Sequence, residues 1–188
     1  MPLPNFELLK GTVSHQFRER GLTHFSSACE FIQNLPYGRI SDRDNLDLVL
    51  LEKRGTCSSK HGILARLCEE NGHEEIELIA GIFLMSPETH VELTNFFKDK
   101  PYSSLPEMHC YFRLSTHDRY DFTSKNNRLT LIEPKLVREQ RIEPHQTGDW
   151  KAKIHQDYLR KWVARKPELE LSFDEIWAQR EECIRLLY

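Results

Sequence analysis

Residues 53–68 read KRGTCSSKHGILARLC and combine a turn signal with the start of a helix. Gly55 marks a tight turn, and from Ile63 onward apolar residues recur at helical spacing until Asn71-Gly72 gives a stop signal. Cys57 is therefore expected in the first turn of this helix. There, unpaired backbone N–H groups and the positive end of the helix dipole favour the thiolate. The same N–H groups can stabilise an oxyanion, which makes Cys57 a candidate nucleophile.

Upstream of this stretch the sequence predicts two further helices. Residues 1–22 have only weak patterning and read as an irregular arm or a short helix. Thr23 is placed to cap a helix that ends before a Leu-Pro pair. Ser41 or Asp42 is placed to cap a second, shorter helix that stops near Lys53-Arg54.

Downstream the pattern changes to short apolar and aromatic runs, and then to helices. Helical stripes and a Ser-Phe-Asp-Glu capping box predict helices over residues 149–163 and from Ser172 to about Leu187. Strands are predicted at 76–85, 108–114, 119–123 and 129–132, with a connection over 86–107 and a turn at 116–118.

The order of these elements predicts an α+β fold. N-terminal helices, with the cysteine helix among them, pack on a small antiparallel β-sheet, and C-terminal helices follow. No repeat or linker divides the sequence, so residues 1–188 are expected to form one domain. Its core covers about residues 25–125, and a C-terminal helical extension covers about 140–188.

Composition narrows the classes of function. The 188 residues are 39% hydrophobic and 29% charged, as in an ordinary globular chain, and the net charge is −3 without long runs of one sign. This gives no basis for nucleic acid or an anionic membrane as the main partner. No run approaches the roughly 20 apolar residues of a membrane span, and residues 1–20 lack a secretory signal core, so a cytoplasmic location is expected.

The five cysteines are scattered and include no C-x-x-C pair, and the histidines show no metal-ligand spacing. Most of the cysteines are expected to be buried small hydrophobes. The sequence therefore predicts neither a metal site nor a cofactor.

Two residues of the predicted hairpin can complete a site for Cys57. His109 stands at the head of one strand, and Asp121 stands on its partner twelve residues later. Residues near such ends of an antiparallel pair can come within hydrogen-bonding distance when both point to one face. An aspartate that orients an imidazole beside a cysteine is the arrangement of nucleophile, base and orienter used in acyl transfer.

Three blocks resemble the motifs of the transglutaminase-like (papain-like) cysteine superfamily. They are Gly55-Thr56-Cys57, His109 opening an aromatic strand, and Arg119-Tyr120-Asp121-Phe122-Thr123, against the family patterns G-x-C, H-x-W-V-E-V and W-x-x-x-D-x-T. The resemblance covers about residues 25–125. It implies Cys57 as nucleophile, His109 as general base and then acid, and Asp121 as orienter.

The chain also departs from the family pattern. His61 stands four positions after Cys57, where a small residue is usual, and at that spacing it can crowd the site, tune the thiolate or point elsewhere. Tyr111 or Phe112 replaces the tryptophan of the histidine strand, and a phenylalanine follows Asp121 in place of the common proline.

An oxyanion hole at Cys57 would need a second donor besides the backbone N–H of the cysteine. By chain order, the nearest upstream candidates are Gln33 and Tyr37. A surface glutamine and a packing tyrosine are the simpler interpretation of either residue.

The leading hypothesis is an enzyme that forms an acyl-thioester at Cys57 from a peptide, protein or small amide substrate, and then passes the acyl group to water or an amine. One alternative is an arylamine N-acetyltransferase-like enzyme, although no coenzyme A signature is present. Another is a catalytically inactive domain that binds a peptide or protein. The sequence identifies neither the substrate nor the oligomeric state.

Overall fold

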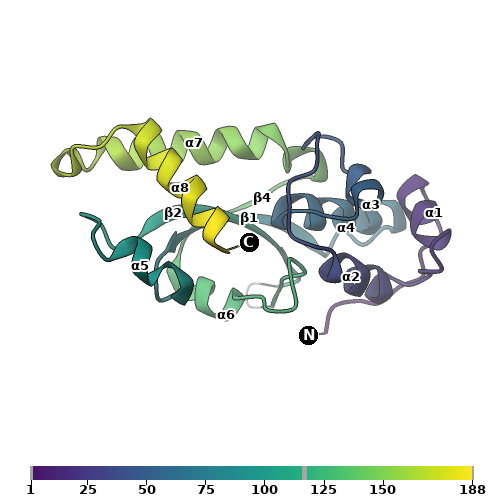
Figure 1. Ribbon diagram of the computed structural model, residues 1–188. Helices are drawn as coiled ribbons and strands as arrows, with labels where there is room; N and C mark the ends of the chain where they lie inside the picture. Colours follow the sequence, from purple (N-terminus) through teal and green to yellow (C-terminus); the bar gives the residue numbers. More distant parts are fainter. Residues whose placement is uncertain (1, 116–117, 188) are drawn as a thin grey trace.

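A four-stranded antiparallel sheet runs through the computed structural model, which describes residues 2–115 and 118–187. Helices lie at both ends of this sheet, so the mixed α+β class predicted from the sequence is confirmed (Figure 1). In chain order the elements are α1 (Thr12–Arg18), α2 (Phe25–Asn34), α3 (Leu48–Glu52), α4 (Cys57–Asn71), β1 (Glu77–Met85), η1 (Val91–Leu93), α5 (Thr94–Phe97), β2 (Leu105–Arg113), β3 (Arg119–Tyr120), α6 (Leu129–Ile132), η2 (Glu133–Lys135), β4 (Leu136–Arg141), η3 (Pro144–Gln146), α7 (Asp149–Ala164), η4 (Pro167–Leu169) and α8 (Phe173–Leu187).

The strands follow the order β3-β2-β1-β4, and each neighbouring pair is antiparallel. β1 pairs with β2 along its whole length, with residue 81 opposite His109. β3 pairs with β2 at only two positions, Phe112 with Tyr120 and Arg113 with Arg119. Within the described residues, the edge of β2 at His109 therefore has no strand partner on the β3 side.

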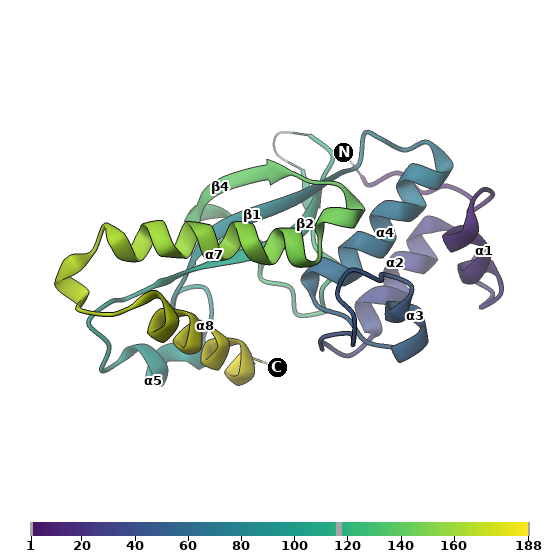
Figure 2. The ribbon, with the colours of Figure 1, turned by 90° about the horizontal axis from the view of Figure 1, so that it is seen from above.

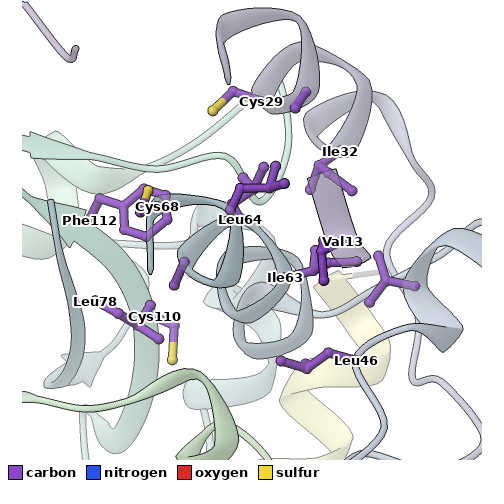
Figure 3. Packing of buried hydrophobic residues seen from close by; sticks show 14 of the residues in the cluster. Val13, Cys29, Ile32, Leu46, Ile63, Leu64, Cys68, Leu78, Cys110 and Phe112 are labelled. Atoms are coloured by element: carbon purple, nitrogen blue, oxygen red, sulfur yellow. The ribbon is translucent and has the colours of Figure 1, made fainter. Parts of the chain in front are cut away.

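The two faces of the sheet bury different partners. Leu78, Cys110 and Phe112 belong to a large apolar cluster formed with α4, and Figure 3 shows them on the sheet side of that helix. Ile79 and Tyr111 form a smaller cluster with the first residue of α6. Because successive residues of a strand point to opposite faces, His109 lies on the face of Tyr111 and Cys110 on the face covered by α4.

The C-terminal helices build a second core. α5, α7 and α8 pack around the ends of β1 and β2 that lie away from α4, and their cluster includes Phe83, Leu105, Leu159 and Ile176. Figure 2 shows α1 to α4 gathered at one end of the sheet, α5 and α8 at the other end, and α7 running along it. The last third of the chain therefore helps to enclose the sheet.

Local sequence signals predicted where α4 and α8 begin and where α4 ends. α4 begins at Cys57 as predicted, and it ends at Gly72 in the left-handed conformation (φ 79°), which glycine adopts without a steric penalty. α8 begins after the predicted capping box: the backbone N–H of Ser172 donates to Glu175 Oε2 (2.8 Å) and the backbone N–H of Glu175 donates to Ser172 Oγ (3.3 Å).

Upstream, the predicted helices are present with different beginnings. The N-cap residue of α2 is His24 and not Thr23. α3 begins only at Leu48, later than the predicted starts at Ser41 or Asp42. The side chain of Asp42 instead accepts a hydrogen bond from the backbone N–H two residues further on (3.0 Å), which forms a turn in place of a helix.

In the sheet region one prediction is wrong and one strand was missed. Residues 129–132 form the helical turn α6 and not an edge strand, because the carbonyl of Arg128 accepts the N–H groups of Leu131 and Ile132 (2.9 Å each). Four apolar residues are too few for periodicity to separate the two states. The strand β4 was not predicted, since its charged sequence LVREQR suits an edge position more than an apolar strand pattern. The turn predicted at 116–118 lies mostly outside the described residues.

Candidate active site

The first turn of α4 holds Cys57 against the sheet. Thr56 is the N-cap residue, and its backbone N–H donates to Ser59 Oγ (2.9 Å), so a capping interaction fixes where the helix begins. Cys57 is 7% exposed and forms part of the wall of a cavity. The nucleophile predicted from the sequence is thus nearly buried but accessible from one side.

The glycine before this turn is required for space. A Cβ atom at Gly55 would lie 2.8 Å from Cγ of Lys60 and 3.0 Å from Oγ of Ser59. The left-handed residue of the turn is Lys53 (φ 53°), so the tight turn predicted at Gly55 is made two residues earlier. Gly55 itself pairs with the upstream segment through a β-bridge to Tyr37.

His109 and Asp121 come together as predicted. Nε2 of His109 lies 2.9 Å from Oδ2 of Asp121, and both side chains are nearly buried. The β2–β3 register places Asp121 opposite Tyr111, just beyond the last strand pair, so Asp121 and His109 are diagonal neighbours on one face. Because Nε2 is used by the carboxylate, Nδ1 of His109 is the nitrogen left for the thiol of Cys57.

The segment after β3 leaves the sheet and wraps around Asp121. Oδ1 of Asp121 accepts the backbone N–H of Thr123 (2.8 Å), and the N–H of Phe122 is taken by His61 (2.9 Å). These N–H groups cannot continue a β-ladder, which explains why β3 ends at Tyr120 and not at Thr123 as predicted.

His61 is fully buried and connects the two halves of the site. Its Nε2 accepts the N–H of Phe122, so this nitrogen carries no proton and Nδ1–H donates to the carbonyl oxygen of Cys57 (2.8 Å). Burial lowers the pKa of His61, which agrees with a neutral ring. The structure gives His61 a role that the sequence did not suggest, because its two ring nitrogens link α4 to the segment after Asp121.

Lys60 forms a second link between α4 and the segments around it, and it was not predicted from the sequence. Its side chain is completely buried, and Nζ donates to the carbonyl oxygens of Leu35 (2.6 Å) and Thr123 (2.7 Å). Burial lowers the pKa of Lys60 to about 8, while the negative charges of Asp121 and Cys57 act against this shift. Lys60 lies three residues after Cys57 and therefore on the same side of α4. This spacing is the feature of the sequence that could have predicted its place in the site.

The charges of the site favour a thiolate–imidazolium pair. The pKa of Cys57 lies well below its usual value, first because of its interaction with the neighbouring thiol of Cys110. Burial acts in the opposite direction, and the positive charges of Lys151 and His109 add to the lowering of this pKa. Burial also disfavours the charged form of His109, but Asp121 and Cys57 prevail and raise the pKa of His109 to about 10.

Asp121 completes this charge pattern as a carboxylate. Burial alone would raise its pKa, but the charge of His109 and the hydrogen bond between the two residues lower it to about 2. Near neutral pH His109 is therefore an imidazolium and Asp121 a carboxylate, and the lowered pKa of Cys57 favours its thiolate beside them. This charge pattern is the one that an activated cysteine nucleophile requires.

Two buried residues near Cys57 were not predicted from the sequence as parts of the site. Lys151 of α7 donates from Nζ to the carbonyl oxygen of Met108 (2.7 Å), which fixes a positive charge behind β2. Cys110 was expected to be only a packing residue, but its thiol interacts with that of Cys57. Neither residue forms a sequence motif with Cys57, so only the packing of α4 and α7 on β2 reveals them.

A cavity of about 510 Å³ lies beside the three predicted residues. Cys57, His109 and Asp121 all line it. Its apolar wall comes from β1, α6 and α8 and consists of Phe83, Met85, Ile132, Ile184 and Leu187. Its polar wall comes from the segment after Asp121 and includes Thr123, Ser124, Asn126 and Asn127.

The charged side chains of the cavity wall are paired. Arg128 binds Glu92 through both of its terminal nitrogens, and Glu107 binds Arg180 of α8 at 2.5 and 2.6 Å. Burial, together with the positive charge of Arg128, lowers the pKa of His90 to about 4, so its ring is neutral near pH 7. The cavity therefore suits a neutral ligand with both an apolar and a hydrogen-bonding part.

The two candidate oxyanion-hole residues have different positions. Gln33 donates from Nε2 to the carbonyl oxygens of Ser124 (3.1 Å) and Asp121 (3.4 Å), so its amide supports the segment after β3. Tyr37 lines the cavity together with Cys57 and is held there by its backbone bridge to Gly55. Of the two, Tyr37 is the one placed to face a bound substrate.

Comparison of the chain with protein-family models, with curated proteins and with solved structures finds no match. Within residues 2–115 and 118–187, no group of three or more His, Cys, Asp or Glu side chains is arranged to hold a metal ion. Among the described helices, none combines the length and apolar character needed to cross a membrane. The function is therefore argued from the site itself.

Proposed function

We propose that the chain is a cysteine enzyme of the transglutaminase-like type that transfers the acyl group of a neutral amide or peptide-like substrate through a thioester at Cys57. The observation that carries the proposal is the 2.9 Å contact between His109 and Asp121, with Cys57 beside the imidazole at the wall of the cavity. The substrate class follows from the paired charges of the cavity and its mixed apolar and polar walls.

The first half of the reaction consumes the thiolate. Sγ of Cys57 attacks the carbonyl carbon, and the N–H groups at the start of α4 stabilise the oxyanion that forms. As the tetrahedral intermediate collapses, the C–N bond breaks and His109 gives its Nδ1 proton to the leaving amine. The products of this half are a thioester on Cys57 and a free amine.

In the second half, the neutral His109 removes a proton from water or from a second amine, which attacks the thioester carbon. The C–S bond breaks, the acid or a new amide leaves, and the thiolate–imidazolium pair is restored. Asp121 keeps its charge throughout and stabilises the imidazolium form of His109. Whether water or an amine is the acceptor determines whether the enzyme is a hydrolase or a transferase.

The structure bears on both alternatives. An acetyltransferase that uses acetyl-coenzyme A would need cationic groups for its phosphates, but Arg128 and Arg180 are already paired with Glu92 and Glu107. An inactive binding domain would be favoured by a broken His–Asp contact and a sealed cysteine, whereas Cys57 lines the cavity. Both observations favour the proposed transfer of an acyl group from an amide. We place this reaction in the cytoplasm, where thiols stay reduced.

The proposal is tested by the reactivity of Cys57. Iodoacetamide at pH 6.5–7 should modify Cys57 at least tenfold faster than any of the other four cysteines, as measured by peptide mass spectrometry. Cys57→Ala should abolish the fast phase and leave the circular dichroism spectrum unchanged. Cys29→Ala, which removes a buried thiol from the same apolar cluster, is the matched control and should retain the fast phase.

A library of amide, ester and thioester substrates then tests the acyl-transfer step, with mass spectrometry of the intact protein to detect an acyl adduct on Cys57. Release of coenzyme A from acetyl-coenzyme A would instead support the acetyltransferase alternative. Equal alkylation rates for all five cysteines in the folded protein would refute the proposed nucleophile.

A further inference from the structure

The site contains a second thiol that the proposed reaction does not use. Cys110 follows His109 directly in the chain and points to the opposite face of β2, where α4 covers it. Ser58, the second residue of α4, connects the two sulfur atoms: its Oγ lies 3.8 Å from Sγ of Cys57 and 3.8 Å from Sγ of Cys110. One hydroxyl thus touches both thiols.

The two thiols differ in their accessibility. Cys57 lines the cavity of about 510 Å³ and keeps 7% of its surface exposed, so a small solute in the cavity can approach it. Cys110 is completely buried and is not among the residues that line that cavity. An oxidant in the cavity therefore meets Cys57 first, and Cys110 can react only through Cys57.

We propose that Cys57 and Cys110 form a reversible disulfide, in which Cys57 is the peroxide-sensitive thiol and Cys110 is its resolving partner. The proposal rests on the proposed function in one respect, since both need a reactive thiolate at Cys57. It goes beyond that function because it assigns a role to Cys110 and an oxidative modification to the site.

The chemistry takes two steps with hydrogen peroxide as the oxidant. The Cys57 thiolate attacks one oxygen of the peroxide, the O–O bond breaks, and the products are a sulfenic acid on Cys57 and hydroxide. The sulfur of Cys110 then attacks the sulfenic sulfur, the S–O bond breaks, and the S–S bond forms with the release of water. The hydroxide takes up the proton that the Cys57 thiol had given to His109, so one peroxide is reduced to two waters and two thiols are oxidised to one disulfide.

The disulfide protects Cys57 from irreversible oxidation. A sulfenic acid without a neighbouring thiol is oxidised further to sulfinic acid, which thiols do not reduce. With Cys110 in place, oxidation should stop at the disulfide. The nucleophile is blocked in that state, and a dithiol reductant restores it.

The experiment treats the whole chain with hydrogen peroxide and follows both cysteines by peptide mass spectrometry before and after dithiothreitol. The wild-type chain should lose two hydrogen atoms, give a linked peptide containing Cys57 and Cys110, and lose iodoacetamide labelling at Cys57 until dithiothreitol restores it. Cys110→Ala should instead accumulate sulfinic acid at Cys57 and recover no labelling. Cys29→Ala, which lacks a buried thiol of the same cluster, should behave like the wild type.

Two results separate this proposal from the proposed function. Fast alkylation of Cys57 without a linked peptide, and with equal formation of sulfinic acid in wild type and Cys110→Ala, would overturn the disulfide and leave the nucleophile standing. A linked peptide with no acyl adduct from any substrate would support the disulfide and refute the acyl-transfer proposal. If Cys110→Ala fails to fold, the presence or absence of the linked peptide in the wild-type chain still decides the question.

Discussion

Replacement of Asp121 by asparagine isolates the charge that holds His109 protonated. Asparagine has the shape of aspartate, and its oxygen can still accept the N–H of Thr123, so the segment after β3 keeps its turn. What disappears is the negative charge 2.9 Å from Nε2 of His109. The pKa of His109 should therefore fall.

The structure sets the size of this effect. The pKa of His109 is raised from 6.5 to about 10, an interval that corresponds to about 5 kcal/mol in favour of the imidazolium form. Asp121 and Cys57 are the two sources of this stabilisation, and the charge of Asp121 is the larger one. Assigning half of the interval to Asp121 gives about 2 to 3 kcal/mol, which is a roughly 50-fold rise in the acid dissociation constant of His109.

The assay is a pH titration of the histidine carbon signals by NMR, with the signal of His109 assigned by comparison with His109→Gln. A second readout is unfolding free energy against pH. Because the folded pKa lies above the unfolded one, the pair stabilises the wild type fully below about pH 6.5. This contribution is lost as the pH rises towards 10, so the stability difference between Asp121→Asn and wild type should shrink over that range. A His109 signal that titrates near 6.5 in the wild type, or at one pH in both proteins, would refute the reasoning.

Three further substitutions test the supports of the site, each by urea denaturation. His61→Ala leaves the buried N–H of Phe122 without its acceptor and opens a cavity, so the free energy of unfolding should fall by about 3 kcal/mol. An unchanged midpoint would show that the hydrogen bonds of His61 do not stabilise the fold. Gly55→Ala places a Cβ atom against the Lys60 side chain, whose Nζ is anchored to two carbonyl oxygens, and should cost about 1 to 3 kcal/mol; an unchanged midpoint would contradict the steric argument. Arg180→Met leaves Glu107 buried and unpaired and should cost about 3 to 5 kcal/mol; adding Glu107→Gln should recover part of this, and no recovery would argue against the pair.

The parts of the fold that follow from local rules could be predicted from the sequence. The start of α4, its glycine stop and the capping box of α8 depend on contacts within a few residues, so the pattern alone located them. The end of β3 could not be located in this way. It depends on His61, which is 61 residues away in the chain from the N–H that it accepts.

The residues of the candidate site also fall into those that the sequence predicts and those that only the fold reveals. Cys57, His109 and Asp121 could be selected because each has a recognisable neighbourhood in the sequence. Lys60, which belongs to the same site, could not, because a lysine on a helix is expected at the surface unless its ammonium group finds partners. It finds them in two carbonyl oxygens, from segments 25 and 63 residues away.

The C-terminal extension bears on what the site can bind and how reactive it is. α7 contributes Lys151, whose charge favours the Cys57 thiolate from behind β2. α8 contributes Ile184 and Leu187 to the apolar wall of the cavity, and Arg180 from the same helix neutralises Glu107. A resemblance limited to residues 25–125 covers the three side chains of the proposed reaction but not this cationic support or this wall. If the acyl-transfer proposal is correct, substrate choice should therefore respond to substitutions at Ile184 that leave the reactivity of Cys57 towards iodoacetamide unchanged.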